Sequence, residues 1–195
     1  MNSNLPNLEM TSQDVLEFLE LTCANQIEIW IDGGWSVDAL LDHKTHLRAW
    51  SLLEHQTRPH ADLDIALAHK DVPKLRALLE ARGYKDVPRD DTRDCNFVLG
   101  DDFGHQIDFH SFMFGDAGEI IFGVPYPRES LTGTGVIAGV QVNCISPEWL
   151  VKFHTGYEVD VDDYHDVFLL CEKFGIEMPL EFEKFRINPK AIFKK

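Results

Sequence analysis

Apolar and polar positions along this chain follow two periods, and each period predicts one kind of element. Apolar residues recur at helical spacing, between residues that can cap or end a helix, at about 12–24, 73–83 and 162–174. Runs rich in alternating apolar residues predict strands at about 27–31, 62–67, 96–99, 105–112, 120–124 and 136–142. A further helix should start at Ser146-Pro147, because serine caps a helix and proline suits its first turn.

The order of these elements predicts an α+β fold. We expect a mixed β-sheet with helices packed behind it, followed by short C-terminal helices. At 195 residues the chain has the length of one domain. The predicted parts of that domain are a core at about 12–145, a helical segment at about 146–180 and a tail at 181–195.

Two carboxylates share one face of the strand predicted at 62–67. Successive side chains on a strand point to opposite faces, so Asp62 and Asp64 lie side by side. Burying two like charges this close is unfavourable unless a cation or a solvent-filled cleft offsets the repulsion. A divalent metal ion is the simplest solution, and an edge strand with a solvated acidic face is the alternative. Alternation in 105–112 adds Asp108 as a third candidate from another strand.

A glycine pair, Gly33 and Gly34, follows the strand predicted at 27–31. We expect a helix to start just afterwards, near Trp35 or Ser36. Backbone N–H groups at a helix N-terminus can bind phosphate, and glycine allows a close approach to the backbone. The pair therefore suggests a phosphate cradle, with a plain tight turn as the other interpretation.

The chain contains a short internal duplication. The sequence LLDHKT at 40–45 is nearly repeated twelve residues later as LLEHQT at 52–57. If these residues only lengthened a helix, they would add about 18 Å and about 120° of rotation, so all that follows would face another direction. We therefore expect a looped-out or folded-back insert.

Composition restricts the class of partner. The chain has 18 basic and 33 acidic residues, and its formal charge of -15 argues against nucleic acid while fitting metal ions or cationic small molecules. The four cysteines are scattered and include no C-x-x-C pair, so we interpret them as buried thiols in a reducing cytoplasm. No apolar run approaches the roughly 18 residues of a membrane span, and the N-terminus lacks signal-peptide features. We expect a cytoplasmic protein that binds no membrane.

The acidic residues and the glycine pair form a set whose chemistry can be stated. Two carboxylates on one strand, joined by a third from a neighbouring strand, can hold two divalent ions that bridge the phosphates of a nucleotide. One ion lowers the pKa of an attacking hydroxyl. The other offsets the charge that develops on a leaving pyrophosphate during in-line displacement.

Three motifs follow one another along the chain: DGGWSVDALL at 32–41, TRPHADLDIA at 57–66 and IDFH at 107–110. In this order they resemble the motifs of the lincosamide nucleotidyltransferases and related aminoglycoside adenylyltransferases of the polymerase-beta-like superfamily. The likeness covers most of the chain from about 27 to 175, including VKFHTGY at 151–157 and DYHDV at 163–167. The combination is specific, whereas each motif alone is not. The resemblance implies the nucleotidyltransferase fold.

The resemblance also implies an activity. It points to transfer of a nucleoside monophosphate, usually AMP from ATP, to a hydroxyl of a small antibiotic-like acceptor, with Mg²⁺ and with release of pyrophosphate. Asp62 and Asp64 would be metal ligands, and Asp108 would be a third ligand or the general base. Gly33 and Gly34 would lie under the triphosphate. Trp35 and Ser36 would lie beside the triphosphate. The candidate contacts with phosphate or acceptor are Arg58, His60 and Lys152.

The duplication is where the chain departs from that family. In the sequences of that family the TRxH motif follows the DALL motif almost directly, whereas here 27 residues separate Gly34 from Asp62. Only the second copy of the repeat leads into Asp62, so that copy should supply the functional continuation. The departure affects the expected acceptor site more than the metal site.

Two other functions fit parts of the pattern. The histidines near the carboxylates, His60, His105 and His110, could form a mononuclear His/Asp metal site for hydrolysis, although no H-x-x-x-H or H-E-x-x-H spacing supports it. Alternatively, the fold could serve as a nucleotide-binding or antitoxin-like module. The presence of all three carboxylates argues against lost catalysis.

Overall fold

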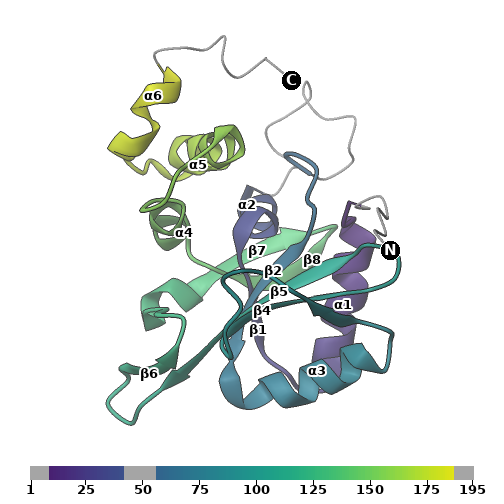
Figure 1. Ribbon diagram of the computed structural model, residues 1–195. Coiled ribbons are helices and arrows are strands. Elements are labelled where there is room, and N and C mark those ends of the chain that lie inside the picture. The colour runs from purple at the N-terminus through teal and green to yellow at the C-terminus, as the bar shows by residue number, and fades with distance from the viewer. Residues whose placement is uncertain (1–8, 42–55, 187–195) are drawn as a thin grey trace.

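A computed structural model describes residues 9–41 and 56–186 as a mixed β-sheet with helices packed against it (Figure 1). The helices are α1 (Ser12–Ala24), α2 (Gly33–Leu41), α3 (Val72–Glu80), α4 (Pro147–Phe153), α5 (Val161–Phe174) and α6 (Glu183–Arg186). The strands are β1 (Ile29–Ile31), β2 (Leu63–Ala68), β3 (Lys85–Val87), β4 (Asn96–Gly100), β5 (Gln106–Phe114), β6 (Ile120–Gly123), β7 (Gly133–Ile137) and β8 (Val140–Cys144). The predicted α+β fold is confirmed.

The strand order brings the acidic strands together. Neighbouring strands follow the order β3-β4-β5-β2-β1-β8-β7, and β6 pairs with β5. β2 runs parallel to β5, and their register sets Asp64 directly beside Asp108. On its other side β2 is antiparallel to β1, the strand that leads into Gly33. The three predicted elements of the site thus meet on adjacent strands.

Burial holds that register in place. Leu63, Ile65 and Leu67 of β2 have no exposed surface. A slip of one residue would turn these side chains to the opposite face and bring the aspartates into the core, which would be strongly unfavourable. In the view of Figure 1, α1 and α3 lie together against the lower right of the sheet, whereas α2 gathers with α4 and α5 above it.

The helix after the glycine pair starts earlier than predicted. α2 begins at Gly33 and not near Trp35 or Ser36. Asp32 explains the difference, because its Oδ1 accepts a 2.8 Å bond from the Gly33 amide and its carbonyl accepts a 3.2 Å bond from the Ser36 amide. Aspartate is a favourable residue just before a helix for this reason. Gly33 and Gly34 therefore form the first turn of α2.

The single strand predicted at 136–142 is wrong. The structure has a hairpin there, in which β7 and β8 are joined at Ala138 and Gly139. Both joining residues have positive φ, 47° and 87°, as a two-residue hairpin turn of the type I′ kind requires. Alanine rarely adopts positive φ, so Ala138 gave no turn signal and Gly139 was the single turn residue at that position.

Other differences are smaller. β3 was not predicted, because three residues are too few to show a periodic pattern. Phe182, in the segment expected to be the tail, is fully buried and packs near Tyr164 of α5. The expected looped-out insert at 42–53 lies outside the described residues. Cys23 is exposed and Cys95 half-buried, so the cysteines are not all buried thiols. Within the described ranges, no helix is long and apolar enough to cross a membrane.

Candidate functional site

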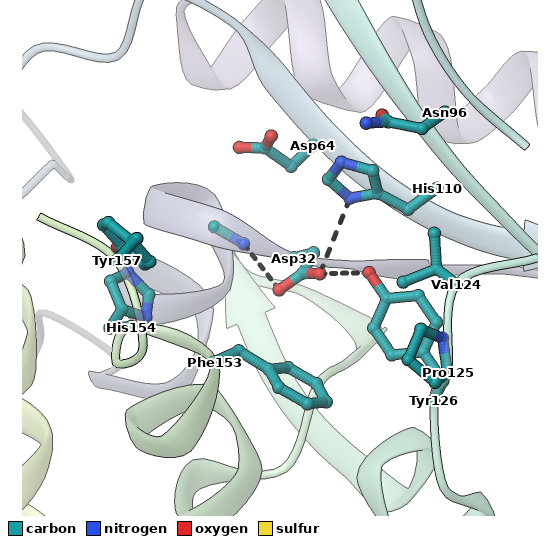
Figure 2. A pocket seen from close by; sticks show the side chains of 11 residues that line it. Asp32, Asp64, Asn96, His110, Val124, Pro125, Tyr126, Phe153, His154 and Tyr157 are labelled. Carbon is teal, nitrogen blue, oxygen red and sulfur yellow. Dashed lines mark hydrogen bonds and ion pairs between the residues drawn. The ribbon is translucent and has the colours of Figure 1, made fainter. Parts of the chain in front are cut away.

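A pocket of about 390 Å³ opens where β1, β2 and β5 face the C-terminal helices (Figure 2). Its polar side consists of Asp32, Gly33, Asp64, Asn96 and His110. Its facing wall consists of Val124, Pro125, Tyr126, Phe153, His154 and Tyr157. The pocket therefore joins an acidic surface on the sheet to a largely aromatic wall.

The acidic surface contains a compact group of possible metal ligands. One ligand atom from each of Asp64, Asp108 and His110 lies within 4.8 Å of the others. His110 Nε2 is 3.6 Å from Asp108 Oδ1. That oxygen is buried and has no hydrogen-bond partner within the part of the chain that the structure describes. A buried carboxylate oxygen without a partner is costly, so the arrangement fits a cation that the oxygen could coordinate.

The charges of this group are out of balance. Burial, and then repulsion by Asp62, raises the pKa of Asp64 to about 8. Burial also raises the pKa of Asp108, with Asp62 again adding to the effect. Burial acts against the His110 cation, but Asp32, Asp64 and Asp108 outweigh it and raise the pKa of His110 to about 9. One protonated histidine thus faces several carboxylates, and further positive charge would stabilise the site.

Asp62 lies at the edge of this group. It is half-buried and precedes the first residue of β2. Its charge acts on both Asp64 and Asp108, yet it is not part of their tight cluster with His110. The structure therefore brings two of the three predicted carboxylates into contact range and sets the third next to them.

Asp32 and Tyr126 are site residues that the sequence reasoning missed. Tyr126 donates a 2.5 Å hydrogen bond to Asp32 Oδ2, and His110 Nδ1 lies 3.8 Å from the same oxygen (Figure 2). Burial alone would raise the pKa of Asp32, but His110, Tyr126 and the Gly33 amide outweigh it and lower that pKa. Asp32 was visible as the first residue of DGGW, whereas no local signal marked Tyr126 in its proline-rich loop.

The glycine pair is required by close packing at the start of α2. Gly33 has a φ of 54°, and a Cβ there would overlap Asp64 Oδ2. A Cβ on Gly34 would come within 2.5 Å of His60 Nδ1 and 2.9 Å of Arg58 Nη2. The pair therefore brings the N-terminus of α2 directly against the acidic strand.

Gly33→Ala is expected to destabilise the protein more than Gly175→Ala, a matched glycine replacement, does. Gly175, which ends α5, also has a left-handed conformation (φ 68°), but a Cβ there would meet nothing within 4 Å. Both variants lose about 1–2 kcal/mol from the unfavourable backbone conformation. Only Gly33→Ala adds a clash, which costs about 1–3 kcal/mol more. Chemical denaturation measures both, and equal losses would contradict the close packing of Gly33 on Asp64.

Two predicted contacts, Arg58 and His60, are engaged with other side chains. Arg58 Nη2 lies 2.8 Å from Asp166 Oδ2 of α5. His60 is buried, and its Nε2 lies 2.6 Å from Asp38 Oδ2 of α2. His60 is therefore a packing partner of α2, whereas Arg58 keeps an exposed fraction of 26%.

Three further predicted contacts do not line the pocket with their side chains. Trp35 and Ser36 are buried in the core, at 1% and 0% exposure. Lys152 is exposed, and its Nζ lies 4.3 Å from the ring centre of Trp149. The side chains of Trp35 and Ser36 thus do not line the pocket, and Phe153, the residue after Lys152, lines it in place of Lys152.

The histidines of the alternative hydrolase site do not meet. His105 Nδ1 lies 2.9 Å from Asp101 Oδ2, and both residues line a separate cavity beside α1 and α3. His60 is engaged with Asp38. Among the described residues, only His110 of the three joins Asp64 and Asp108.

Comparison with known proteins agrees with this geometry. The sequence profile of the aminoglycoside-2''-adenylyltransferase family matches residues 14–170. The lincosamide resistance protein of Staphylococcus haemolyticus is 26% identical over 170 residues, which cover 84% of this chain and 96% of that protein.

Solved structures show the same fold. The lincosamide antibiotic adenylyltransferase LnuA, solved with lincomycin, has a TM-score of 0.67 at 24% identity, covering 84% of this chain and 98% of that chain. ANT(2'')-Ia, solved with adenylyl-2''-tobramycin, has a TM-score of 0.62 at 20% identity, covering 93% and 95%. The predicted nucleotidyltransferase fold and the predicted class of enzyme are confirmed. The chain belongs to the aminoglycoside-2''-adenylyltransferase family.

Proposed function

We propose that this protein transfers AMP from ATP to a hydroxyl of a small antibiotic-like acceptor, of the lincosamide or aminoglycoside type, and releases pyrophosphate. The observation that carries the proposal is the side-by-side position of Asp64 and Asp108 on β2 and β5, next to Gly33 at the start of α2. Family membership supports nucleotidyl transfer, and the relatives named above are adenylyltransferases or resistance proteins.

The donor set fits magnesium. Mg²⁺ prefers carboxylate oxygens, and Asp64 and Asp108 present them within one cluster. We assign Asp62 as a further ligand because its charge acts on the same two carboxylates. Two ions are expected when a nucleotide is bound, and their chemistry would be to neutralise phosphate charge and to lower the pKa of the acceptor hydroxyl.

The start of α2 supplies donors for the phosphates. Asp32 already accepts the amides of Gly33 and Ser36. The first four amides of a helix have no partner within it, and those of Gly34 and Trp35 belong to this group and can therefore meet a ligand. We propose that these two amides, together with the Arg58 guanidinium, contact the triphosphate. Lys152 stays a candidate contact on the exposed side of α4.

The acceptor fits the aromatic wall. Tyr126, Phe153 and Tyr157 face the acidic strands across the pocket (Figure 2). An acceptor held between the two sides would bring a hydroxyl close to Asp108. We propose that Asp108 takes the proton of that hydroxyl as general base, the alternative to a role as third metal ligand, since its Oδ1 has no hydrogen-bond partner within the described residues.

The direct test is transfer by the purified protein. Incubation with Mg-ATP and a panel of lincosamides and aminoglycosides should release pyrophosphate and yield an adenylylated acceptor, detected by mass spectrometry. The other nucleoside triphosphates identify the preferred donor. Binding of Mg-ATP without transfer to any acceptor would favour the nucleotide-binding module instead. Phosphate release that needs no acceptor would favour the hydrolase.

Deleting residues 42–53 is expected to leave Mg-ATP binding unchanged within about twofold. The two ends of this segment are held close together, because the Thr57 amide donates a 2.8 Å bond to Asp38 Oδ1, one turn before α2 ends at Leu41. The two residues left between Leu41 and Gln56 should therefore be able to close the gap. Isothermal titration measures nucleotide affinity. A folded deletion variant that no longer binds Mg-ATP would show that the insert belongs to the phosphate site.

A further inference from the structure

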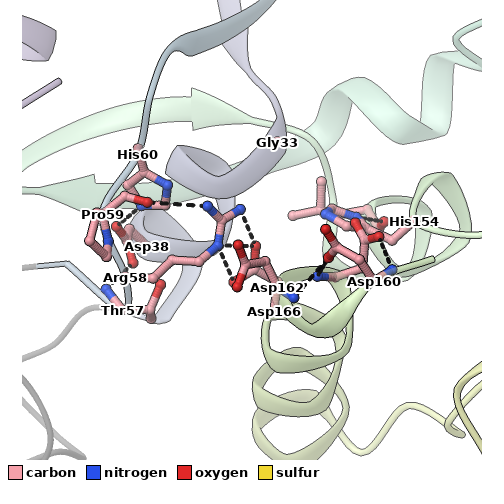
Figure 3. A network of polar contacts seen from close by, with 12 residues as sticks. Gly33, Asp38, Thr57, Arg58, Pro59, His60, His154, Asp160, Asp162 and Asp166 are labelled. Atoms are coloured by element: carbon pink, nitrogen blue, oxygen red, sulfur yellow. Dashed lines mark hydrogen bonds and ion pairs between the residues drawn. The ribbon is translucent and has the colours of Figure 1, made fainter. Parts of the chain in front are cut away.

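An ion pair joins the segment before β2 to the C-terminal helical region (Figure 3). Arg58 Nε lies 3.1 Å and Nη2 lies 2.8 Å from Asp166 Oδ2, and Nε is also 3.3 Å from Oδ1. Asp166 has no exposed surface, whereas the Arg58 side chain is 26% exposed. A fully buried carboxylate thus holds one edge of a guanidinium whose other edge still reaches solvent.

The held guanidinium lies over the start of α2. Its Nη2 is 2.9 Å from the position that a Cβ of Gly34 would take, so it rests on the first turn of α2, whose Gly33 lines the pocket. A guanidinium has five N–H groups. Within the described part of the chain, bonds to Asp166 and the 3.3 Å bond to the Pro59 carbonyl occupy three of them, and two can meet an anion.

The segment that carries Arg58 is itself fixed on α2. The Thr57 amide and His60 Nε2 bond to the two oxygens of Asp38, at 2.8 Å and 2.6 Å. The backbone on both sides of Arg58 is therefore positioned without Asp166. The long side chain of arginine, however, has many conformations, and fixing one of them costs conformational entropy. Only a partner that binds the guanidinium itself can fix its position.

We propose that Asp166 is a positioning residue for nucleotide binding, which fixes the Arg58 guanidinium over Gly34, where it meets the phosphates of the nucleotide. The proposal rests on the proposed function, because it requires a nucleoside triphosphate at the start of α2. It assigns a task in the phosphate site to α5, a helix of the C-terminal region. Asp166 acts only through Arg58.

The test is a double-mutant cycle on the full chain. Asp166→Asn keeps the shape of the side chain and removes its charge, and Arg58→Ala removes the group that it holds. The dissociation constant of a non-hydrolysable Mg-ATP analogue is measured by isothermal titration. We expect each single variant to bind at least about tenfold more weakly. Because Asp166 acts through Arg58, adding Asp166→Asn to Arg58→Ala should change the affinity by less than about twofold.

A different link of α5, made directly to α2, provides the control. Lys173 of α5 donates 2.7 Å bonds to the carbonyls of Leu40 and Leu41 at the far end of α2. Lys173→Met should lower thermal stability yet leave nucleotide affinity within about twofold of the wild type. Arg58→Lys is the second test if Asp166→Asn does not fold, since a lysine keeps the charge but cannot hold Asp166 with two donors and a phosphate at once. It should also bind at least about fivefold more weakly.

The outcomes separate the proposals. A wild-type chain that binds no Mg-ATP analogue overturns the proposed function and this inference with it. A wild-type chain that binds it, with an Asp166→Asn or Arg58→Lys variant that binds equally well, overturns the inference alone. The inference also fails if Lys173→Met weakens nucleotide binding as much as Asp166→Asn does. It fails too if Asp166→Asn lowers the affinity of the Arg58→Ala variant as much as that of the wild type, because both results indicate a general effect on the fold.

Discussion

Asp64→Asn is expected to lower kcat by at least about a thousandfold. Asp64 is the residue that the structure sets at the centre of the acidic group, beside Asp108 across the strands and against Gly33 at the start of α2. The proposed metal contributes several kcal/mol to stabilising the transition state, and each 1.36 kcal/mol corresponds to a factor of ten in rate. Steady-state release of pyrophosphate measures the loss. Asp62→Asn should also abolish turnover, if its carboxylate is the further ligand that we propose.

The same substitution should make the metal-free protein more stable. The pKa of Asp64 is raised to about 8 by burial and by Asp62, from an unperturbed value of 3.8. A carboxyl whose pKa is higher in the folded than in the unfolded protein opposes folding once the pH exceeds the unfolded value. As the pH rises from about 4 to about 8, the melting temperature of the wild type should therefore fall progressively further below that of Asp64→Asn.

A surface aspartate supplies the control for both measurements. Asp102 lies in the turn between β4 and β5, and its exposed side chain pairs with Lys85 of the edge strand β3. Asp102→Asn should retain kcat and should gain no stability as the pH rises, because exposed ion pairs contribute little. Undiminished turnover in Asp64→Asn would remove that carboxylate from the site, whatever its effect on stability.

Asp108→Asn is expected to lower kcat by at least about a hundredfold while changing nucleotide affinity by less than about tenfold. As general base, Asp108 would accept the proton of the acceptor hydroxyl, and removal of a positioned base costs about 10²–10⁴ in rate. Nucleotide binding would still use Asp64 and the start of α2. Titration with Mg-ATP followed by single-turnover transfer measures the two quantities separately.

The opposite pattern would give Asp108 a different role. A pure metal ligand should weaken metal and nucleotide binding together, by more than the tenfold that corresponds to about 1.4 kcal/mol. Its Oδ1, which has no hydrogen-bond partner among the described residues, and its position beside Asp64 are compatible with either role. Retained transfer with unchanged affinity would show that the base lies elsewhere and that Asp108 is only a neighbour of the site.

The sequence by itself determined the parts of the site that depend on local periodicity and on motifs. Alternation placed Asp64 and Asp108 on strands, and the glycine pair was recognised before a helix, because side-chain direction on a strand and the conformation of glycine are local properties. The α+β class also followed from the order of periodic segments. These features need no knowledge of which segments pack together.

Only the tertiary structure decided which of these residues meet. The parallel pairing of β2 with β5 brings Asp64 to Asp108 across 44 positions of sequence, and the loop after β6 brings Tyr126 to Asp32 across 94. The tertiary structure also pairs His60 with Asp38, buries the side chain of Trp35 and joins Arg58 to Asp166. Burial and partner choice depend on long-range packing, in which a polar side chain takes the partner that the fold supplies, so a local pattern can name a candidate residue but cannot say what it will contact.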